Sequence, residues 1–236
     1  GGTIQLESSS FSTISDGTIS MTGDGFILPA LGTGTFKVYN LTINSTGGSY
    51  ILSRDAFFNY DTIINDFTIV ADTVNFTNLS GLPENFYVGG DMEVEDGAIV
   101  TANVNNAMTV IGDLTLRADG TSKPSWIDNE NLSVSGNTYV ENGDYVDRRW
   151  HFISSPVSNA KTIIFLWMYF KWWDEANYEW NFVAPTNYLL VPGIGYTIWD
   201  TLGSHEVIYT GGRLNSGDYS PTLTATDRNG GGIGND

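Results

Sequence analysis

The chain has 236 residues, of which 41% are hydrophobic, and its 27 acidic and 10 basic residues give a formal net charge of −17. This hydrophobic content supports a packed core and excludes global disorder. The acidity argues against nucleic acid as a partner, because phosphate contacts need Lys and Arg, and the lack of cysteine excludes disulfides and thiolate chemistry.

A four-residue phrase recurs along residues 16–140: Asp or Asn, two variable residues, then Ile, Val or Leu. Its copies begin at Asp16, Asn40, Asp66, Asp91, Asp113 and Asn137, which are 24, 26, 25, 22 and 24 residues apart. A strand-like repeat of this length predicts a right-handed parallel β-helix, a β-solenoid in which each repeat is one stacked coil. An antiparallel sandwich is the alternative, but we favour the solenoid because the phrase itself recurs.

Within residues 1–146 apolar and polar residues alternate, as in Leu41-Thr42-Ile43, which predicts strands with one buried face. We expect the recurring Asp or Asn to lie at a corner of each coil, because these residues tolerate left-handed geometry and hydrogen-bond local backbone. Stacked about 4.8 Å apart, their side chains would form a ladder along the solenoid.

Near residue 147 the phrase stops, and six of the seven Trp residues lie at or after Trp150. We therefore expect a second domain over residues 147–236, an aromatic-rich antiparallel β-sandwich that is incomplete at its C-terminus. The predicted strands are 150–154, 163–173, 180–183, 196–199, 207–209 and 222–226. A buried helix is an alternative for 163–173. The longest apolar run, 162–170, is far shorter than the roughly 20 residues that a membrane-spanning helix needs.

Four phrases of the second domain carry a family resemblance: RWHFISSPV at 149–157, WDEAN at 173–177 followed by Trp180, PGIGYTIW at 192–199 and YTGGRLNSG at 209–217. Together they resemble the C-terminal region of large secreted and cell-surface proteins of Bacteroidota that the type IX secretion system exports. In that group a β-helical stretch often precedes such a module. The resemblance implies an extracellular or cell-surface location and the type IX machinery as a partner, but it implies no reaction.

The chain departs from that group after Gly230, where the group continues with a Trp-containing phrase and an Asn-Pro-Tyr-Pro turn. The resemblance also implies O-linked glycans on Asp-Ser/Thr-apolar triplets. Three triplets fit, and their acceptor residues are Thr62, Thr73 and Thr201.

No catalytic set stands out. The two histidines, His151 and His205, lie in a predicted strand and a predicted turn, and no nucleophile elbow or zinc motif is present. Asp91, Glu93 and Glu95 share one face of a strand and could bind Ca²⁺, but we favour a solvated acidic face beside the buried Met92 and Val94. We expect no catalytic residues, no resident metal and no cofactor.

Acidic side chains between tryptophans suggest a carbohydrate site, because rings stack on sugar faces and carboxylates accept hydroxyl hydrogens. A hairpin turn flanked by core tryptophans is the alternative reading. The candidate residues are Trp172, Trp173, Asp174, Glu175, Tyr178 and Trp180.

The sequence thus predicts a non-enzymatic extracellular structural or adhesive protein that self-associates or binds surface glycans. The alternatives are a carbohydrate-binding or accessory region of a secreted polysaccharide-degrading enzyme, and a β-helical lyase or hydrolase.

Overall fold

The computed structural model describes residues 2–6, 16–22, 25–29, 37–44, 49–54, 61–70, 73–78, 84–102, 106–118, 122–127, 131–145, 148–202, 205–216 and 218–220. This part of the chain is all-β, apart from a 3₁₀ turn, η1, at Thr162–Phe165. It contains no helix long and apolar enough to cross a membrane. The predicted strand at 222–226 lies outside the described residues.

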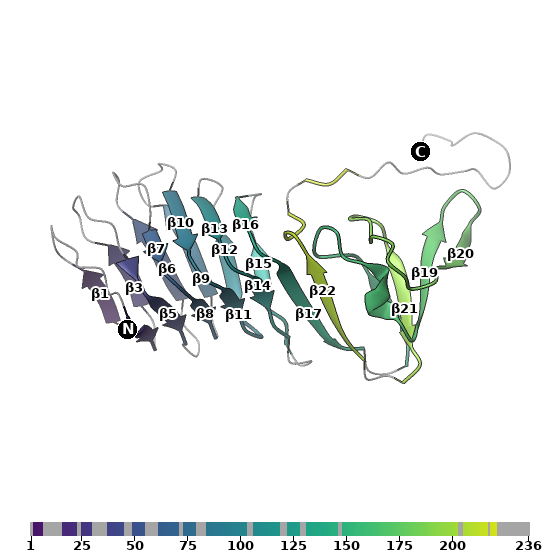
Figure 1. Ribbon diagram of the computed structural model, residues 1–236, viewed down its shortest axis with the longest axis horizontal. Helices are drawn as coiled ribbons and strands as arrows, with labels where there is room; N and C mark the ends of the chain where they lie inside the picture. Colours follow the sequence, from purple (N-terminus) through teal and green to yellow (C-terminus); the bar gives the residue numbers. More distant parts are fainter. Residues whose placement is uncertain are drawn as a thin grey trace, which may run out of the picture.

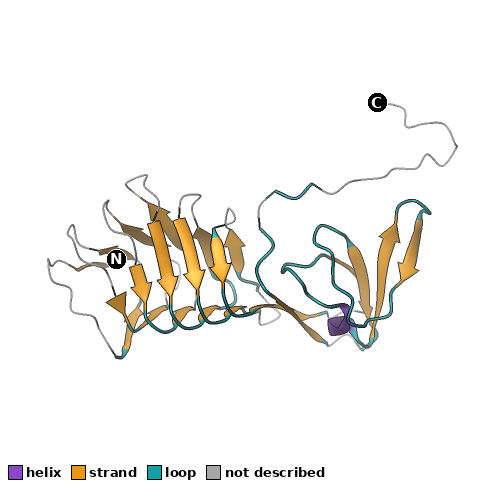
Figure 2. Cartoon of the chain, turned by 45° about the horizontal axis from the view of Figure 1, so that its top comes forward, coloured by secondary structure: helices purple, strands orange, loops and turns teal. Residues whose placement is uncertain are grey.

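Three parallel sheets lie side by side in the first part of the chain (Figures 1 and 2). The first contains β1 (Gly2–Leu6), β3 (Gly25–Pro29), β6 (Ser49–Arg54), β9 (Thr73–Asn78), β12 (Ile99–Ala102) and β15 (Ser125–Ile127). The second contains β2 (Thr18–Met21), β5 (Asn40–Ile43), β8 (Phe67–Ile69), β11 (Met92–Val94), β14 (Leu114–Leu116) and β17 (Thr138–Asp144). The third contains β4 (Lys37–Val38), β7 (Asp61–Ile63), β10 (Glu84–Val88), β13 (Asn106–Val110) and β16 (Leu132–Val134). From β2 to β17 the chain visits the second, first and third sheets in a fixed order.

The apolar positions of the phrase stack on one another along the second sheet. Leu41, Phe67, Met92 and Leu114 pair in register, as do Ile43, Ile69, Val94 and Leu116. Each of these eight side chains is buried, whereas the residue between each pair is only half-buried. The predicted one-sided burial is confirmed here, because side chains at alternate strand positions point to opposite faces.

The predicted ladder of Asp and Asn side chains is also present. The Asn40 side-chain oxygen accepts the backbone N–H of Asp66 at 3.1 Å, and Asp66 accepts that of Asp91 at 3.0 Å. Asp91 in turn accepts the N–H of Asp113 at 2.8 Å, and Asp113 that of Asn137 at 2.7 Å. Each repeat therefore fixes its position on the one before it through one side-chain oxygen.

The last three ladder residues, Asp91, Asp113 and Asn137, each follow a glycine. At Gly90, Gly112 and Gly136 the preceding repeat lies too close to leave space for a Cβ atom. A Cβ at Gly112 would collide with the Asp91 carboxylate and would lie 2.6 Å from the carbonyl oxygen of Gly90. At these three repeats the glycine before the ladder residue is thus a packing requirement.

The last part of the chain forms an antiparallel sheet in the order β18 (Trp150–Ile153), β21 (Tyr196–Asp200), β19 (Met168–Asp174) and β20 (Glu179–Phe182). The predicted strands at 150–154, 180–183 and 196–199 match these strands within one residue, while 163–173 divides into η1 and β19. The strand β22 (Glu206–Gly211) does not join this sheet. It pairs antiparallel with β17 and so extends the second sheet across the expected domain boundary.

Replacing Gly112 with Ala should destabilise the fold by about 1–3 kcal/mol, the usual cost of overpacking a filled site. The measurement is the urea midpoint of the purified chain. Gly195→Ala is the matched control, because no atom lies within 4 Å of its added Cβ. Equal midpoints for the two variants would contradict the close approach at Gly112.

Replacing Asp91 with Ala should cost about 1–3 kcal/mol of stability, because the backbone N–H of Asp113 loses its acceptor. Asp91→Asn keeps an acceptor oxygen and should retain most of that stability. Thermal unfolding of both variants at the same pH checks the difference, and an Asn variant as unstable as the Ala variant would count against the ladder.

Candidate functional site

The antiparallel sheet has one buried face and one exposed face, set by the alternation of its strands. The inner face carries Ile153, Phe170 and Ile198, all buried in the core. The outer face carries the residues between them. We call it the aromatic face, and it consists of Trp150, Phe152, Tyr169, Lys171, Trp173, Trp180, Phe182, Thr197 and Trp199.

Large rings on the aromatic face are open to solvent. Phe152 is 78% exposed and Phe182 is 67% exposed. Neighbouring rings hold one another in place: the centroids of Phe152 and Trp180 are 6.0 Å apart, and those of Tyr169 and Phe182 are also 6.0 Å apart. The face is therefore a pre-arranged set of rings, and exposed apolar patches of this kind mark binding surfaces.

A cavity of about 280 Å³ lies within this face, lined by Trp150, Phe152, Lys171, Trp180 and Thr197. The Lys171 ammonium lies 4.8 Å from the centroid of the Trp150 ring and 4.3 Å from that of Phe182. Both distances are within the range of cation–π attraction, which holds the long lysine side chain over the rings. Thr197 is only 4% exposed, and its hydroxyl has no hydrogen-bond partner among the described residues.

This arrangement combines flat apolar surface with two polar groups. Rings offer stacking area, the ammonium donates hydrogen bonds, and the threonine hydroxyl can donate or accept. A pocket that is mainly apolar with a few convergent polar groups is the usual form of a small-ligand site.

The structure brings together only part of the predicted carbohydrate site. Trp173 and Trp180 pair directly across β19 and β20, with centroids 5.4 Å apart, and both lie on the aromatic face. Trp172 points to the opposite face and packs against the core. Glu175 is half-buried in the β19–β20 turn, and Tyr178 in the same turn has a φ of +55°.

Asp174 stabilises that turn. Its carboxylate accepts the Asn177 backbone N–H at 3.2 Å and the Asn177 side-chain amide at 3.0 Å, and the Asn181 amide donates to it at 3.3 Å. The side-chain hydrogen bond from Asn177 is the main cause that lowers the pKa of Asp174. The predicted alternative, a structural turn between tryptophans, therefore describes this carboxylate.

Sequence reasoning missed Trp150, Phe152, Lys171, Phe182 and Thr197, which line or surround the cavity. The signal was present as aromatic residues at alternate positions, such as Trp150 with Phe152 and Trp180 with Phe182. These residues form a site only because the strand order places the two pairs on one face of the same sheet.

The other predicted residues lie elsewhere. Thr62 on β7 and Thr73 on β9 are half-buried, whereas Thr201 follows β21 and is exposed. The neighbouring Asp200 is buried, and its carboxylate binds the backbone N–H of Leu202 at 2.9 Å and the ring of His205 at 2.7 Å.

The acidic residues considered as Ca²⁺ ligands have protein partners. Asp91 belongs to the ladder, Glu93 forms an ion pair with Arg117, and Glu95 lies 3.8 Å from the same guanidinium. Burial, followed by repulsion from Glu93, raises the pKa of Glu95. Within the described ranges no group of three His, Cys, Asp or Glu residues lies close enough to hold a metal ion.

Comparison with family models, with curated proteins and with solved structures gave no match for this chain.

The Asp174 carboxyl should titrate below about 3.9, the value of aspartate in an unstructured peptide. The turn then gains stability from the carboxylate above that pH and loses it as pH falls through the lowered pKa. Carboxyl ¹³C NMR measures the midpoint. Asn177→Ala should move it upward, because the largest stabilising hydrogen bond is removed; an unmoved midpoint would contradict this assignment.

Proposed function

We propose that this chain is a non-enzymatic, extracellular adhesive protein that binds glycans through its aromatic face. The exposed aromatic face, with its cavity between Trp150, Phe152 and Trp180, carries the proposal. Sugar rings present apolar C–H faces that stack on flat aromatic rings, while their hydroxyls suit the Lys171 ammonium and the unpartnered Thr197 hydroxyl.

A neutral or weakly charged glycan fits this protein better than a polyanion. The net charge of −17 repels polyanions at long range, and Lys171 is the one basic residue of the aromatic face. The face itself carries no carboxylate, so an uncharged chain of sugar hydroxyls can approach it without an unpaired acid.

We further propose that the parallel strands form a right-handed β-helical stalk that displays the C-terminal module, which resembles the sandwich region of exported Bacteroidota surface proteins. The cyclic strand order and the constant register support the stalk. Its first strands, β1, β2 and β4, each end a sheet. An open sheet edge accepts a further strand, which favours self-association or docking at that end.

The same face also suits the alternative function, a carbohydrate-binding region of a secreted polysaccharide-degrading enzyme. The proposal also includes export by the type IX system, a cell-surface location and O-glycosylation at Thr62, Thr73 and Thr201. Only the resemblance to exported Bacteroidota proteins supports these three points.

A glycan array followed by titration calorimetry tests the proposed binding. Phe152→Ala and Trp180→Ala should each weaken binding of the best array glycan at least tenfold, because each variant removes a stacking ring from the cavity. Tyr188→Ala is the matched control: its ring is 70% exposed but is not part of the aromatic face.

Thermal unfolding of the three variants shows whether they remain folded. Binding that survives both Phe152→Ala and Trp180→Ala, or a chain that binds no glycan on the array, would remove the proposed function.

A further inference from the structure

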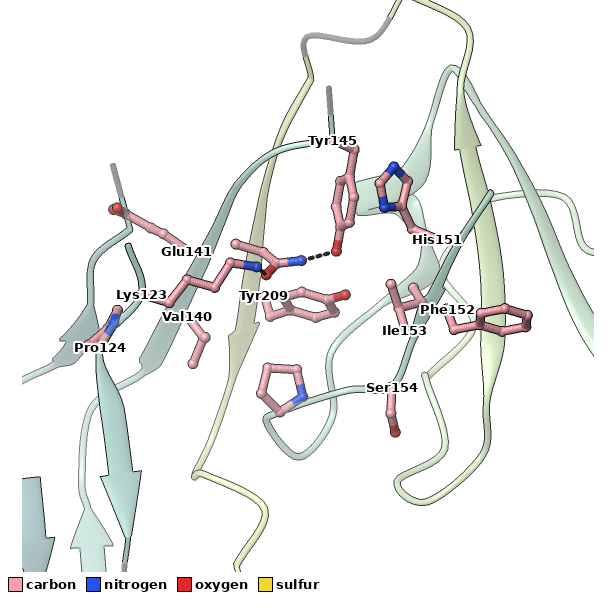
Figure 3. Close-up of a pocket in the computed structure, with 12 residues that line it drawn as sticks. Lys123, Pro124, Val140, Glu141, Tyr145, His151, Phe152, Ile153, Ser154 and Tyr209 are labelled. Carbon is pink, nitrogen blue, oxygen red and sulfur yellow. Dashed lines mark hydrogen bonds between the residues drawn. The ribbon is translucent and has the colours of Figure 1, made fainter. Parts of the chain in front are cut away.

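A second cavity, of about 410 Å³, lies where β17 and β22 meet β18 (Figure 3). Its lining includes Lys123, Glu141, Asn142, Tyr145, His151 and Tyr209. Phe152 contributes to the lining of both this junction pocket and the cavity of the aromatic face, and Figure 3 shows its ring directed away from Lys123 and Tyr145; the two cavities share no other lining residue. The volume of the junction pocket is within the range of small-molecule sites.

Two buried tyrosines provide neutral hydroxyls in the junction pocket. Tyr145 is 7% exposed and Tyr209 is 2% exposed, and burial raises the pKa of both phenols. The Tyr145 hydroxyl accepts a hydrogen bond from the Asn142 side chain. The hydroxyls stay protonated at neutral pH, and the Tyr209 hydroxyl donates to that of Tyr145, which leaves the Tyr145 hydrogen to bind a polar ligand.

Lys123 provides a positive charge that has no acidic partner. Its ammonium donates to the side-chain oxygen of Asn142, a neutral acceptor, and among the described residues no carboxylate forms an ion pair with it. Burial lowers the pKa of Lys123, and no nearby charge opposes that shift.

The acid in the pocket lining, Glu141, is directed to Arg117, which it shares with Glu93 and Glu95. The Glu141 carboxylate lies 3.1 Å from the Arg117 guanidinium and accepts the backbone N–H of Ala118 at 3.2 Å. Its printed partners are therefore Arg117 and Ala118, and among the described residues Lys123 is the basic residue of the pocket lining without an ion pair.

His151 provides a further unpartnered group. Its Nε2 atom is buried without a hydrogen-bond partner among the described residues, and its ring centroid lies 5.0 Å from that of Tyr145. Figure 3 places Tyr145 between Lys123 and His151. A ligand that satisfies both groups must therefore carry polar atoms at two separated positions.

We propose that the junction pocket binds a hydroxylated monocarboxylate of the uronic acid class, with its carboxylate on Lys123 and a hydroxyl on His151 Nε2. A single cation matches a single negative charge, and the net charge of −17 disfavours a dianion such as phosphate. The Tyr145 hydroxyl, which accepts from Asn142 and Tyr209, can donate its own hydrogen to a further sugar hydroxyl.

The test is titration calorimetry of the full chain with D-glucuronate and D-galacturonate, compared with D-glucose and D-galactose. At least one uronate should bind at least tenfold more tightly than its neutral sugar, because a charge-assisted hydrogen bond is made only by the acid. Lys123→Gln should abolish this preference, and His151→Phe should weaken uronate binding severalfold.

Two controls make the result specific. Lys161→Gln removes a charge from an exposed lysine outside the pocket and should leave the preference intact. Trp180→Ala disrupts the aromatic face and should also leave it intact, which separates this inference from the proposed glycan-binding face. The inference is overturned by equal affinity for acid and neutral sugars, by an unchanged preference in Lys123→Gln, or by its loss in Trp180→Ala.

Discussion

The structure depends on a single repeated contact, in which the side-chain oxygen of one Asp or Asn accepts the backbone N–H of the next. From Asn40 to Asn137 this contact fixes the position of each repeat relative to the repeat before it. Because the side-chain period of a strand is two residues, a slip of one position would turn the apolar residues outward. The ladder therefore determines which residues form the core. The close approach of one repeat to the next explains the glycines at Gly90, Gly112 and Gly136.

The ladder also determines where the sites lie. Its last member, Asn137, immediately precedes β17, and β17 has a parallel neighbour on one side and antiparallel β22 on the other. One of the two apolar stacks ends there at Thr138, which is buried and pairs with Gly211, while the other continues from Leu116 to Val140. The junction pocket lies at this change from parallel to antiparallel pairing, and its lining includes residues from β17, β22 and the neighbouring β18.

Local patterns in the sequence predicted the strands and corners, because the apolar and polar positions recur in the same order in each copy of the phrase. Pairing between distant strands left no such signal, so the β17–β22 contact and the presence of Lys123 and His151 in one pocket could not be foreseen. Trp172 and Trp173 show the limit within one strand. Adjacent residues point to opposite faces, so only Trp173 joins Trp180, and treating the tryptophans as one cluster concealed this division.

The net negative charge of the chain opposes self-association through the exposed aromatic face. Exposed rings such as Phe152 and Phe182 would favour association of identical molecules through apolar contact. A net charge of −17 opposes that contact, since like-charged chains repel at the distances where association begins. An uncharged ligand does not experience this repulsion, so the same charge that keeps the faces of two chains apart leaves the face open to a neutral glycan.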